Sequence, residues 1–228
     1  MKRFMIKFYK YIYILLLRMR LTNKGVTILS NNCTAGIIYH KLKLRFMSPT
    51  INLQIGNMDF LEFVQHLREY EHCELIEDVS TQEAYPVGIL SDGQLKPVTI
   101  HFMHYKSFEE AKEKWVERYK RINYSNLCIV MEGGNFTTDE LKETFHNLPF
   151  DKKVLFVNEY IADKSYPEEF FVDIYSRDYV PGKLIYKDEE RGIGQYIYLD
   201  RFDYVAFLNS GVIKGSQYVR KQKRRQRI

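Results

Sequence analysis

A polar turn between a β-branched run and a helical pattern holds the residues best suited to chemistry. The chain passes from Val26–Leu29 into Ser30–Cys33 and then into an apolar helical pattern. A strand, a tight turn and a helix in this order place the turn at the carboxyl end of a strand, where open α/β sheets bind ligands. Hydroxyl and amide groups suit hydroxyl-rich ligands, and a helix N-terminus favours phosphate. We therefore expect Ser30, Asn31 and Asn32 to bind a nucleotide-sugar or a lipid-linked sugar.

Cys33 ends this turn and could serve as a nucleophile. A helix N-terminus lowers the pKa of a thiol and so raises the fraction of reactive thiolate. Tyr39 and His40, in the helical pattern after the turn, are further candidates for contact with the substrate. The alternative is structural: the serine and the two asparagines would only cap the helix, and Cys33 would be a small buried side chain. The residues alone leave both interpretations open.

Two histidines and a lysine lie at a second junction, between an alternating strand pattern and a helix start. In Val98–Met103 the alternation places His101 on the face opposite to the apolar side chains, and His104 and Lys106 follow the strand. We expect His104 to act as a general base, His101 to be a second catalytic candidate, and Lys106 to bind a phosphate. His101 also fits an ordinary residue of a sheet face. No carboxylate or third imidazole stands at ligand spacing beside the pair, so we expect neither a metal site nor a cofactor.

Glu132 is a third candidate, because it stands beside Gly133 and Gly134 where a buried strand pattern ends. It could contact the ligand, or these residues could form a plain turn. The chain contains no G-x-S-x-G motif, no P-loop and no Asp-x-Asp motif. The last absence argues against glycosyltransferases of the metal-dependent type that use that motif.

These residues need a frame of strands and helices, and the sequence pattern predicts an α/β fold. From Gly25 onward, short apolar runs typical of strands alternate with helical patterns. We expect three layers, with mainly parallel or mixed strands in a sheet and helices on both of its faces. The expected strands are Val26–Leu29, Ile51–Ile55, Val87–Leu90, Val98–Met103, Leu127–Met131, Val154–Val157 and Val205–Leu208.

Capping patterns mark three of the expected helices. Apolar residues recur at helical spacing in Phe60–Leu67, directly after Asp59, which we expect to cap that helix. A capping box, in which a Ser or Thr is followed by Glu three positions later, occurs at Ser107–Glu110 and again at Thr137–Glu140.

Length and composition indicate one domain. A chain of 228 residues that is 45% hydrophobic can bury one substantial core. We expect a basic segment at 1–24, one α/β domain at 25–213 and a basic, disordered tail at 214–228. The three cysteines are an odd number without C-x-x-C spacing. This argues against a disulfide framework and a zinc site and favours a reducing cytoplasm.

The net charge of +5 is unevenly distributed along the chain. Residues 1–24 and residues 214–228 each contain seven Lys or Arg and no acid, so setting these fourteen aside leaves 25–213 with a net charge of −9. Nucleic-acid affinity depends largely on neutralising phosphates, which makes such an acidic body a poor general binder. We expect no specific nucleic-acid partner.

The basic ends point instead to a membrane surface. The apolar run Tyr11–Leu17 has seven residues, whereas crossing a bilayer takes roughly 20. Nothing after the run resembles a signal-peptide cleavage site. An amphipathic helix on an anionic membrane fits 1–24, and the tail 214–228 could add attraction; the alternative is that 1–24 packs loosely on the domain. We expect a cytoplasmic protein, peripheral on the inner face of the cell membrane.

Three segments carry a family resemblance: Ser30–Cys33 with Gly36–His40 and Leu44–Leu53, then Tyr85–Gly88, and then His101–Trp115. Together they resemble an uncharacterised bacterial family, domain of unknown function 1919, whose members are often labelled exopolysaccharide biosynthesis proteins. The resemblance runs from about residue 26 to about residue 157. It implies an α/β fold and a setting in cell-surface polysaccharide biosynthesis, and it assigns no catalytic residue.

Three functional hypotheses follow from these residues. The leading one is a transferase that moves a glycosyl or related group to or from a nucleotide-linked or lipid-linked sugar. The second is a non-catalytic binding or scaffold module of the same assembly machinery. The third is a cysteine-dependent acyl transferase or hydrolase that uses Cys33 with a histidine. The first hypothesis predicts that Asn32, Cys33, His101 and His104 meet in one cleft.

Overall fold

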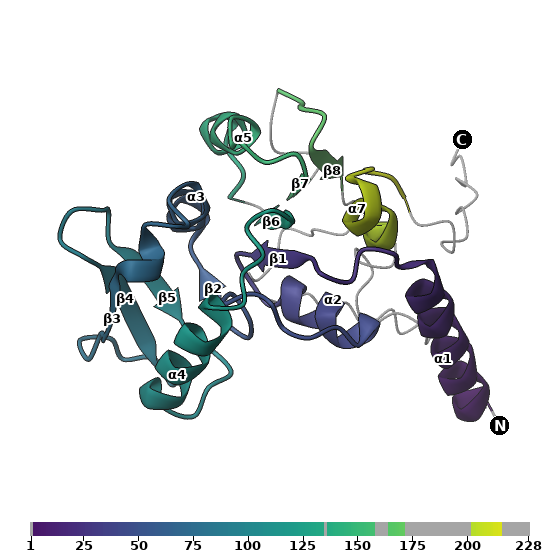
Figure 1. Cartoon of the computed structure of the whole chain (residues 1–228), viewed down its shortest axis with the longest axis horizontal. Helices are drawn as coiled ribbons and strands as arrows, with labels where there is room; N and C mark the ends of the chain where they lie inside the picture. The colour runs from purple at the N-terminus through teal and green to yellow at the C-terminus, as the bar shows by residue number, and fades with distance from the viewer. Residues whose placement is uncertain (1, 135, 158–163, 172–201, 216–228) are drawn as a thin grey trace, which may run out of the picture.

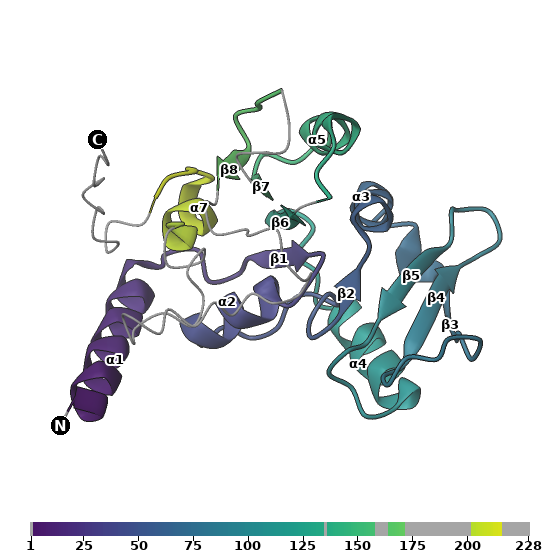
Figure 2. The ribbon, with the colours of Figure 1, turned by 180° about the vertical axis from the view of Figure 1, so that it is seen from behind.

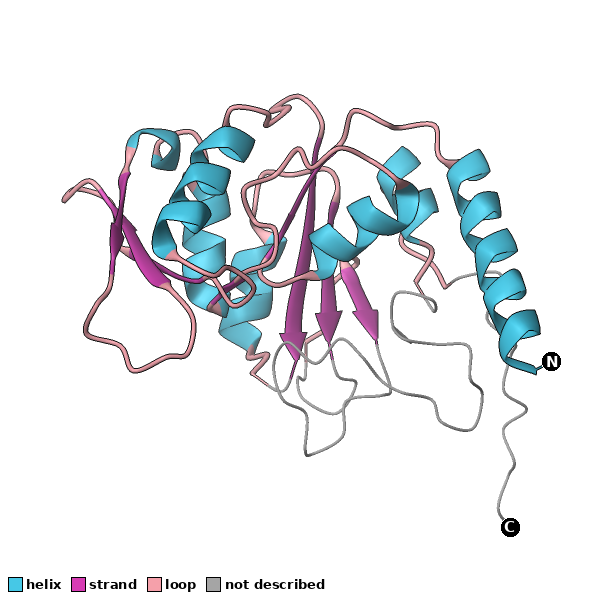
Figure 3. Ribbon diagram, turned by 90° about the horizontal axis from the view of Figure 1, so that it is seen from below, coloured by secondary structure: helices cyan, strands magenta, loops and turns pink. Residues whose placement is uncertain are grey.

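The computed structural model describes residues 2–134, 136–157, 164–171 and 202–215. Their strands form two sheets. The first sheet is parallel throughout, with strand order β1-β6-β7-β8, and Figure 3 shows its arrows pointing the same way. Its strands are β1 (Thr27–Ser30), β6 (Leu127–Gly134), β7 (Lys153–Val157) and β8 (Glu169–Phe171).

The second sheet is antiparallel, with strand order β2-β5-β4-β3. It lies at the end of the molecule opposite to the N-terminal helix, as Figures 1 and 2 show from the two sides. Its strands are β2 (Gln54–Ile55), β3 (Glu74–Glu77), β4 (Val87–Ser91) and β5 (Val98–His101).

Helices connect and cover the strands. They are α1 (Lys2–Arg20), α2 (Thr34–Leu42), α3 (Asn57–Gln65), the short 3-10 helix η1 (Tyr70–His72), α4 (Phe108–Tyr119), α5 (Asp139–His146) and α7 (Tyr204–Ser210).

The alternation of side chains along the parallel strands divides the core between two faces. On β1, Ile28 packs into a cluster with residues of α1, α2 and α7, whereas Leu29 packs into a second cluster with residues of α3, α4 and α5. The second cluster also holds Ile100 and Leu90 of the antiparallel sheet. Helices therefore cover both faces of the parallel sheet, and the expected α/β class with three layers is confirmed.

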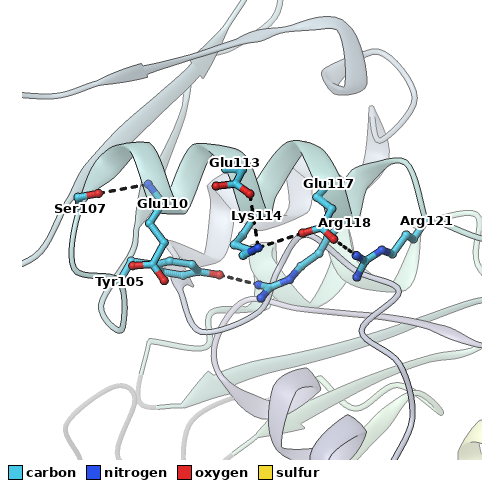
Figure 4. A network of polar contacts seen from close by, with 8 residues as sticks. All are labelled: Tyr105, Ser107, Glu110, Glu113, Lys114, Glu117, Arg118 and Arg121. Atoms are coloured by element: carbon cyan, nitrogen blue, oxygen red, sulfur yellow. Dashed lines mark hydrogen bonds and ion pairs between the residues drawn. The ribbon is translucent and has the colours of Figure 1, made fainter.

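The network around α4 ties this helix to the chain segment that leads into β2. Ser107 caps the helix by accepting the Glu110 N–H at 3.2 Å, which confirms the expected serine cap, while the Glu110 carboxylate accepts the Lys106 N–H at 3.4 Å. Arg118 donates from Nη1 to the Tyr105 hydroxyl at 2.6 Å, and that hydroxyl donates to the Ile51 carbonyl at 2.8 Å. Figure 4 shows the Ser107–Glu110 and Arg118–Tyr105 contacts, with the ion pairs of Glu117 on the same helix.

Val205–Leu208 was expected to be a strand, and this prediction is wrong. The residues form the middle of α7 and are mostly buried. Asp203 caps the helix by accepting the Ala206 N–H at 3.1 Å, and Gly211 ends it with a left-handed φ of 75°. A four-residue apolar run fits a strand and a buried helix equally well, so the two caps decide the outcome.

Two expected caps are shifted along the chain. The helix expected after Asp59 begins earlier, at Asn57, with Gly56 at the cap position. The Asp59 carboxylate accepts the Thr99 N–H and pairs with Lys96, so it joins α3 to the antiparallel sheet. At α5 the capping residue is Thr138, which accepts the Leu141 N–H at 3.2 Å.

Among the described residues, no helix combines the length and the low charge that a bilayer crossing requires.

We predict that Ser107→Ala lowers the free energy of unfolding by about 1 kcal/mol, because the Glu110 N–H loses its partner at the start of α4. Ser107→Asp keeps an acceptor at this position, so its free energy of unfolding should lie within about 0.5 kcal/mol of the wild-type value. Urea denaturation of the three proteins measures both differences. Equal losses for Ala and Asp would show that the cap does not contribute.

Candidate functional site

A cavity of about 210 Å³ opens at the carboxyl ends of β1 and β6. These two strands are parallel neighbours, so their ends meet at one edge of the sheet. The connection from β2 to α3 closes the cavity from the side of the antiparallel sheet. The lining residues are Asn31, Asn32, Gln54, Ile55, Gly56, Asn57, Glu132, Gly133, Gly134 and Phe136.

Asn31 joins the three segments that line the cavity. Its Oδ1 accepts the Glu132 N–H at 3.0 Å, and its Nδ2 donates to the Glu132 carbonyl at 3.0 Å. The same Nδ2 lies 3.0 Å from Oδ1 of Asn57, the first residue of α3. The Asn31 carbonyl accepts the Ile55 N–H of β2 at 2.8 Å. The side chain of Asn31 is therefore fixed by the protein itself.

Asn32 and Glu132 form the polar pair of the site. Asn32 donates from Nδ2 to Glu132 Oε2 at 2.6 Å. Its Oδ1 accepts both the N–H and the hydroxyl of Thr34, at 3.0 and 2.6 Å, which fixes the orientation of the amide. The two residues are only 6% exposed. A carboxylate and an amide are thus held together at the wall of the cavity, with little contact to bulk solvent.

Ser30 serves the turn. It is fully buried, donates to the Asn32 carbonyl at 2.6 Å and accepts the Ala35 N–H at 3.0 Å. The Thr34 N–H is bound by Asn32 Oδ1. Side chains of the turn therefore bind the backbone N–H groups of both Thr34 and Ala35 at the start of α2. The helix N-terminus thus offers neither of them to a phosphate, contrary to the expectation from the sequence.

The end of β6 bends around the cavity. The register of β6 against β7 shifts between Glu132 and Gly134, and Gly134 adopts a left-handed φ of 57°. A Cβ on Gly133 would overlap the Thr137 hydroxyl, so a residue larger than glycine fits only if Thr137 shifts. Asn57 donates from Nδ2 to the Gly133 carbonyl at 3.2 Å. The two glycines thus let the backbone line the cavity closely.

Phe136 adds an aromatic surface to the cavity. Its side chain lines the opening and is 64% exposed. An exposed ring beside amides and a carboxylate can pack against the apolar C–H face of a ligand whose hydroxyls bind the polar wall.

The histidine pair does not share this cavity. His104 and Lys106 are exposed beyond the end of β5, and neither lines it. His101 stands opposite the lining residue Gln54 across the β2–β5 pair, where it packs edge-on against the Tyr85 ring. Within the described ranges its Nδ1 is buried without a hydrogen-bond partner. The expected meeting of the asparagine and histidine pairs in one cleft is therefore not found.

Three more of the expected site residues, Cys33, Tyr39 and His40, also lie outside the cavity. Cys33 is half-buried at the start of α2, and burial raises the pKa of its thiol, which is opposite to what a nucleophile needs. Tyr39 is fully buried; its hydroxyl accepts the Ile28 N–H and donates to the Val26 carbonyl, so it holds β1. His40 is exposed near the other end of α2. None of the three lines the cavity.

Five of the lining residues were not singled out from the sequence: Gln54, Ile55, Gly56, Asn57 and Phe136. Asn57 carried one usable signal, since Asn commonly stands at a helix start, but the capping expectation went to Asp59 instead. Within the parts of the chain that the structure describes, no three His, Cys, Asp or Glu side chains gather as a metal site requires.

We predict that Gly133→Ala destabilises the protein by about 1–3 kcal/mol, because the added methyl meets the Thr137 hydroxyl. The matched control is Gly56→Ala, at a lining glycine with ordinary φ and open space for a Cβ; it should stay within about 0.5 kcal/mol. In the Gly133→Ala/Thr137→Ala double variant the cost should be less than the sum of the single changes. Additive costs in urea denaturation would contradict the contact.

We predict that iodoacetamide modifies Cys33 several-fold more slowly at pH 7 in the folded protein than in urea. Burial raises the pKa of this thiol above its ordinary value of 9.0, so the thiolate fraction at neutral pH falls on folding and recovers only at higher pH. Peptide-resolved mass spectrometry follows the modification. Rapid labelling of Cys33 at neutral pH would restore the cysteine-dependent hypothesis.

Comparison with known proteins places the chain in a family. The family model described as "Domain of unknown function (DUF1919)" matches residues 5–209. A protein of Haemophilus influenzae described as "Uncharacterized protein" is 36% identical over 194 residues, which cover 85% of this chain and 88% of that protein. The residues that the family model matches include most of α1, both sheets and the residues that line the cavity. The chain belongs to the DUF1919 family.

Proposed function

We propose that this protein is a transferase of bacterial capsule or exopolysaccharide biosynthesis, and that the cavity binds the sugar of a nucleotide-linked or lipid-linked substrate. The observation that carries the proposal is the Asn32–Glu132 pair, an amide and a carboxylate held 2.6 Å apart in the wall of a small polar cavity. The polysaccharide setting rests on the resemblance of the sequence segments described above.

The chemistry of the wall suits hydroxyl groups. Amides of Asn32, Gln54 and Asn57 line the cavity. Gln54 can donate and accept hydrogen bonds, and Asn32 and Asn57 each have a second amide hydrogen beyond the one already donated within the protein. Glu132 supplies an acceptor for a ligand hydroxyl, and the Phe136 ring supplies a surface for stacking. No lysine or arginine is among the lining residues that the structure describes. The wall therefore favours the sugar portion of a substrate over its phosphates.

The size of the cavity also fits the sugar portion of a substrate better than the whole substrate. Sites that hold a complete small molecule enclose roughly 300–1,000 Å³, whereas this cavity measures about 210 Å³. It matches one sugar-sized group. In this proposal the nucleotide or lipid part of the substrate extends out of the opening, beside Phe136.

Glu132 takes the role of general base that the sequence suggested for His104, because Glu132 lines the cavity and His104 does not. In the transfer, an acceptor hydroxyl gives its proton to the Glu132 carboxylate and its oxygen bonds to the anomeric carbon. The bond from that carbon to the phosphate breaks, and the phosphate leaves with the electron pair. The Asn32 amide keeps the carboxylate pointed at the cavity.

Lipid-linked sugars are held at a membrane, so the proposed reaction takes place in the cytoplasm on the inner face of the cell membrane. A protein that only organised other enzymes would not need an oriented carboxylate in a sugar-sized cavity. The experiment below separates these two roles, because a scaffold does not lose its effect when one carboxylate becomes an amide.

We predict that Glu132→Gln and Asn32→Ala affect different steps. Glu132→Gln keeps the shape of the side chain, so binding in titration calorimetry against a panel of nucleotide sugars should change only a few-fold. Polymer synthesis in a deletion strain should fall at least about 100-fold, because the base is lost. Asn32→Ala should weaken binding itself by about 10-fold or more, since the Asn32 amide no longer donates to the Glu132 carboxylate.

The control is Glu113→Gln, the same change at an exposed position on α4; it should leave binding and polymer at wild-type levels. Full polymer from both cavity variants would overturn the proposed function. A wild-type protein that binds no member of the panel but still restores polymer would favour the scaffold module.

A further inference from the structure

The N-terminal helix α1 exposes a continuous apolar face. Each of its residues has another member three or four positions away, which places them on one side of a helix. Tyr11 and Met19 are the most open of them, at 61% and 73% exposure. The face consists of Phe8, Tyr11, Ile12, Leu15, Leu16 and Met19.

The other side of α1 is fixed to the protein. Leu17 is buried in the cluster that covers β1, together with residues of α2 and α7. Arg18 donates from Nε to the Lys41 carbonyl at the end of α2, and Arg20 pairs with Asp203 at 2.7 Å. The helix is thus held by its C-terminal half, and Figures 1 and 2 show it running away from the body at the end opposite to the antiparallel sheet.

The segment that carries this face is basic in sequence, although Asp203 pairs with Arg20 near its end. Residues 1–24 contain seven Lys or Arg and no acid. The segment after α2 begins two residues beyond the Lys41 carbonyl that Arg18 contacts, and it adds the exposed side chains of Lys43 and Arg45. An apolar helix face within basic surroundings has the composition of helices that lie in the boundary between lipid headgroups and acyl chains.

We propose that the exposed face of α1 docks on an anionic lipid bilayer, with the helix lying along the surface and its apolar side chains entering the acyl boundary. Anionic lipid complements the basic residues and covers the apolar ones together. A second copy of the chain would cover the apolar face too, but it would bring two basic segments together. The charge therefore selects the bilayer as the occupant.

The docking face and the cavity are built from different elements, so this inference does not depend on the chemistry of Asn32 and Glu132. The face belongs to α1, and none of its residues lines the cavity. Docking would bring the cavity to the compartment where lipid-linked sugars are found. Each of the two proposals can fail while the other stands.

The test is co-sedimentation of the full chain with vesicles of phosphatidylcholine alone or of phosphatidylcholine mixed with phosphatidylglycerol. The wild type should bind the anionic vesicles, bind the neutral ones weakly, and dissociate as salt is raised. Ile12→Glu/Leu16→Glu should lower the partition coefficient for anionic vesicles at least about tenfold. The matched control is Val79→Glu, in an exposed loop far from α1 in sequence, and it should bind as the wild type does.

Circular dichroism and urea denaturation check that the double variant stays folded, which is expected because its substituted side chains are exposed. Failure of the wild type to bind anionic vesicles, or equal binding by the double variant, would overturn the inference. Light scattering supplies the remaining arm: a wild-type dimer that ignores vesicles and becomes a monomer in the double variant would identify a second copy as the occupant and contradict docking on lipid.

Discussion

The site depends on the hydrogen bonds of the Asn31 side-chain amide. The parallel ladder between β1 and β6 ends at the pair Ser30–Val130, and beyond it the Asn31 side chain continues the pairing by accepting from Glu132 N–H and donating to its carbonyl. The same residue reaches Asn57 and Ile55, which belong to α3 and β2. One buried amide therefore fixes the edge where the parallel sheet meets the antiparallel one. Its loss would leave several buried polar groups without partners.

The rest of the site follows from this constraint. With β1 and β6 held in register, Asn32 faces the carboxylate of Glu132, and the bend at Gly133 and Gly134 opens a space between them and α3. That space is lined by uncharged amides and one carboxylate, and its mouth carries an exposed ring, that of Phe136. A small wall of this composition recognises a hydroxyl-rich group through hydrogen bonds and shape. The apolar face of α1 stands apart from it, so recognition and membrane docking are separate properties of one molecule.

Local sequence signals predicted most of the helices and strands, but not which of them lie side by side around the cavity. The turn at Ser30–Cys33 and the cap at Ser107 were read correctly, because strand alternation, turn residues and capping patterns act over a few positions. Glu132 was singled out because it directly follows the expected strand Leu127–Met131 and stands beside two glycines. His104 was expected in the same cleft because it also follows a strand, yet that strand, β5, belongs to the antiparallel sheet. Local periodicity shows neither that the strands divide into two sheets nor that Asn57 comes to line the cavity.

Amide-detected NMR of the isotope-labelled protein, titrated with nucleotide sugars, tests whether the β1–β6 cavity binds a sugar. We expect shifts that saturate and centre on the amides of Asn32, Asn57, Glu132 and Gly133, with saturation transferred from the protein to the sugar protons. Shifts that centre instead on His104 and Lys106, or a spectrum that stays unchanged for every sugar tested, would contradict sugar binding in this cavity.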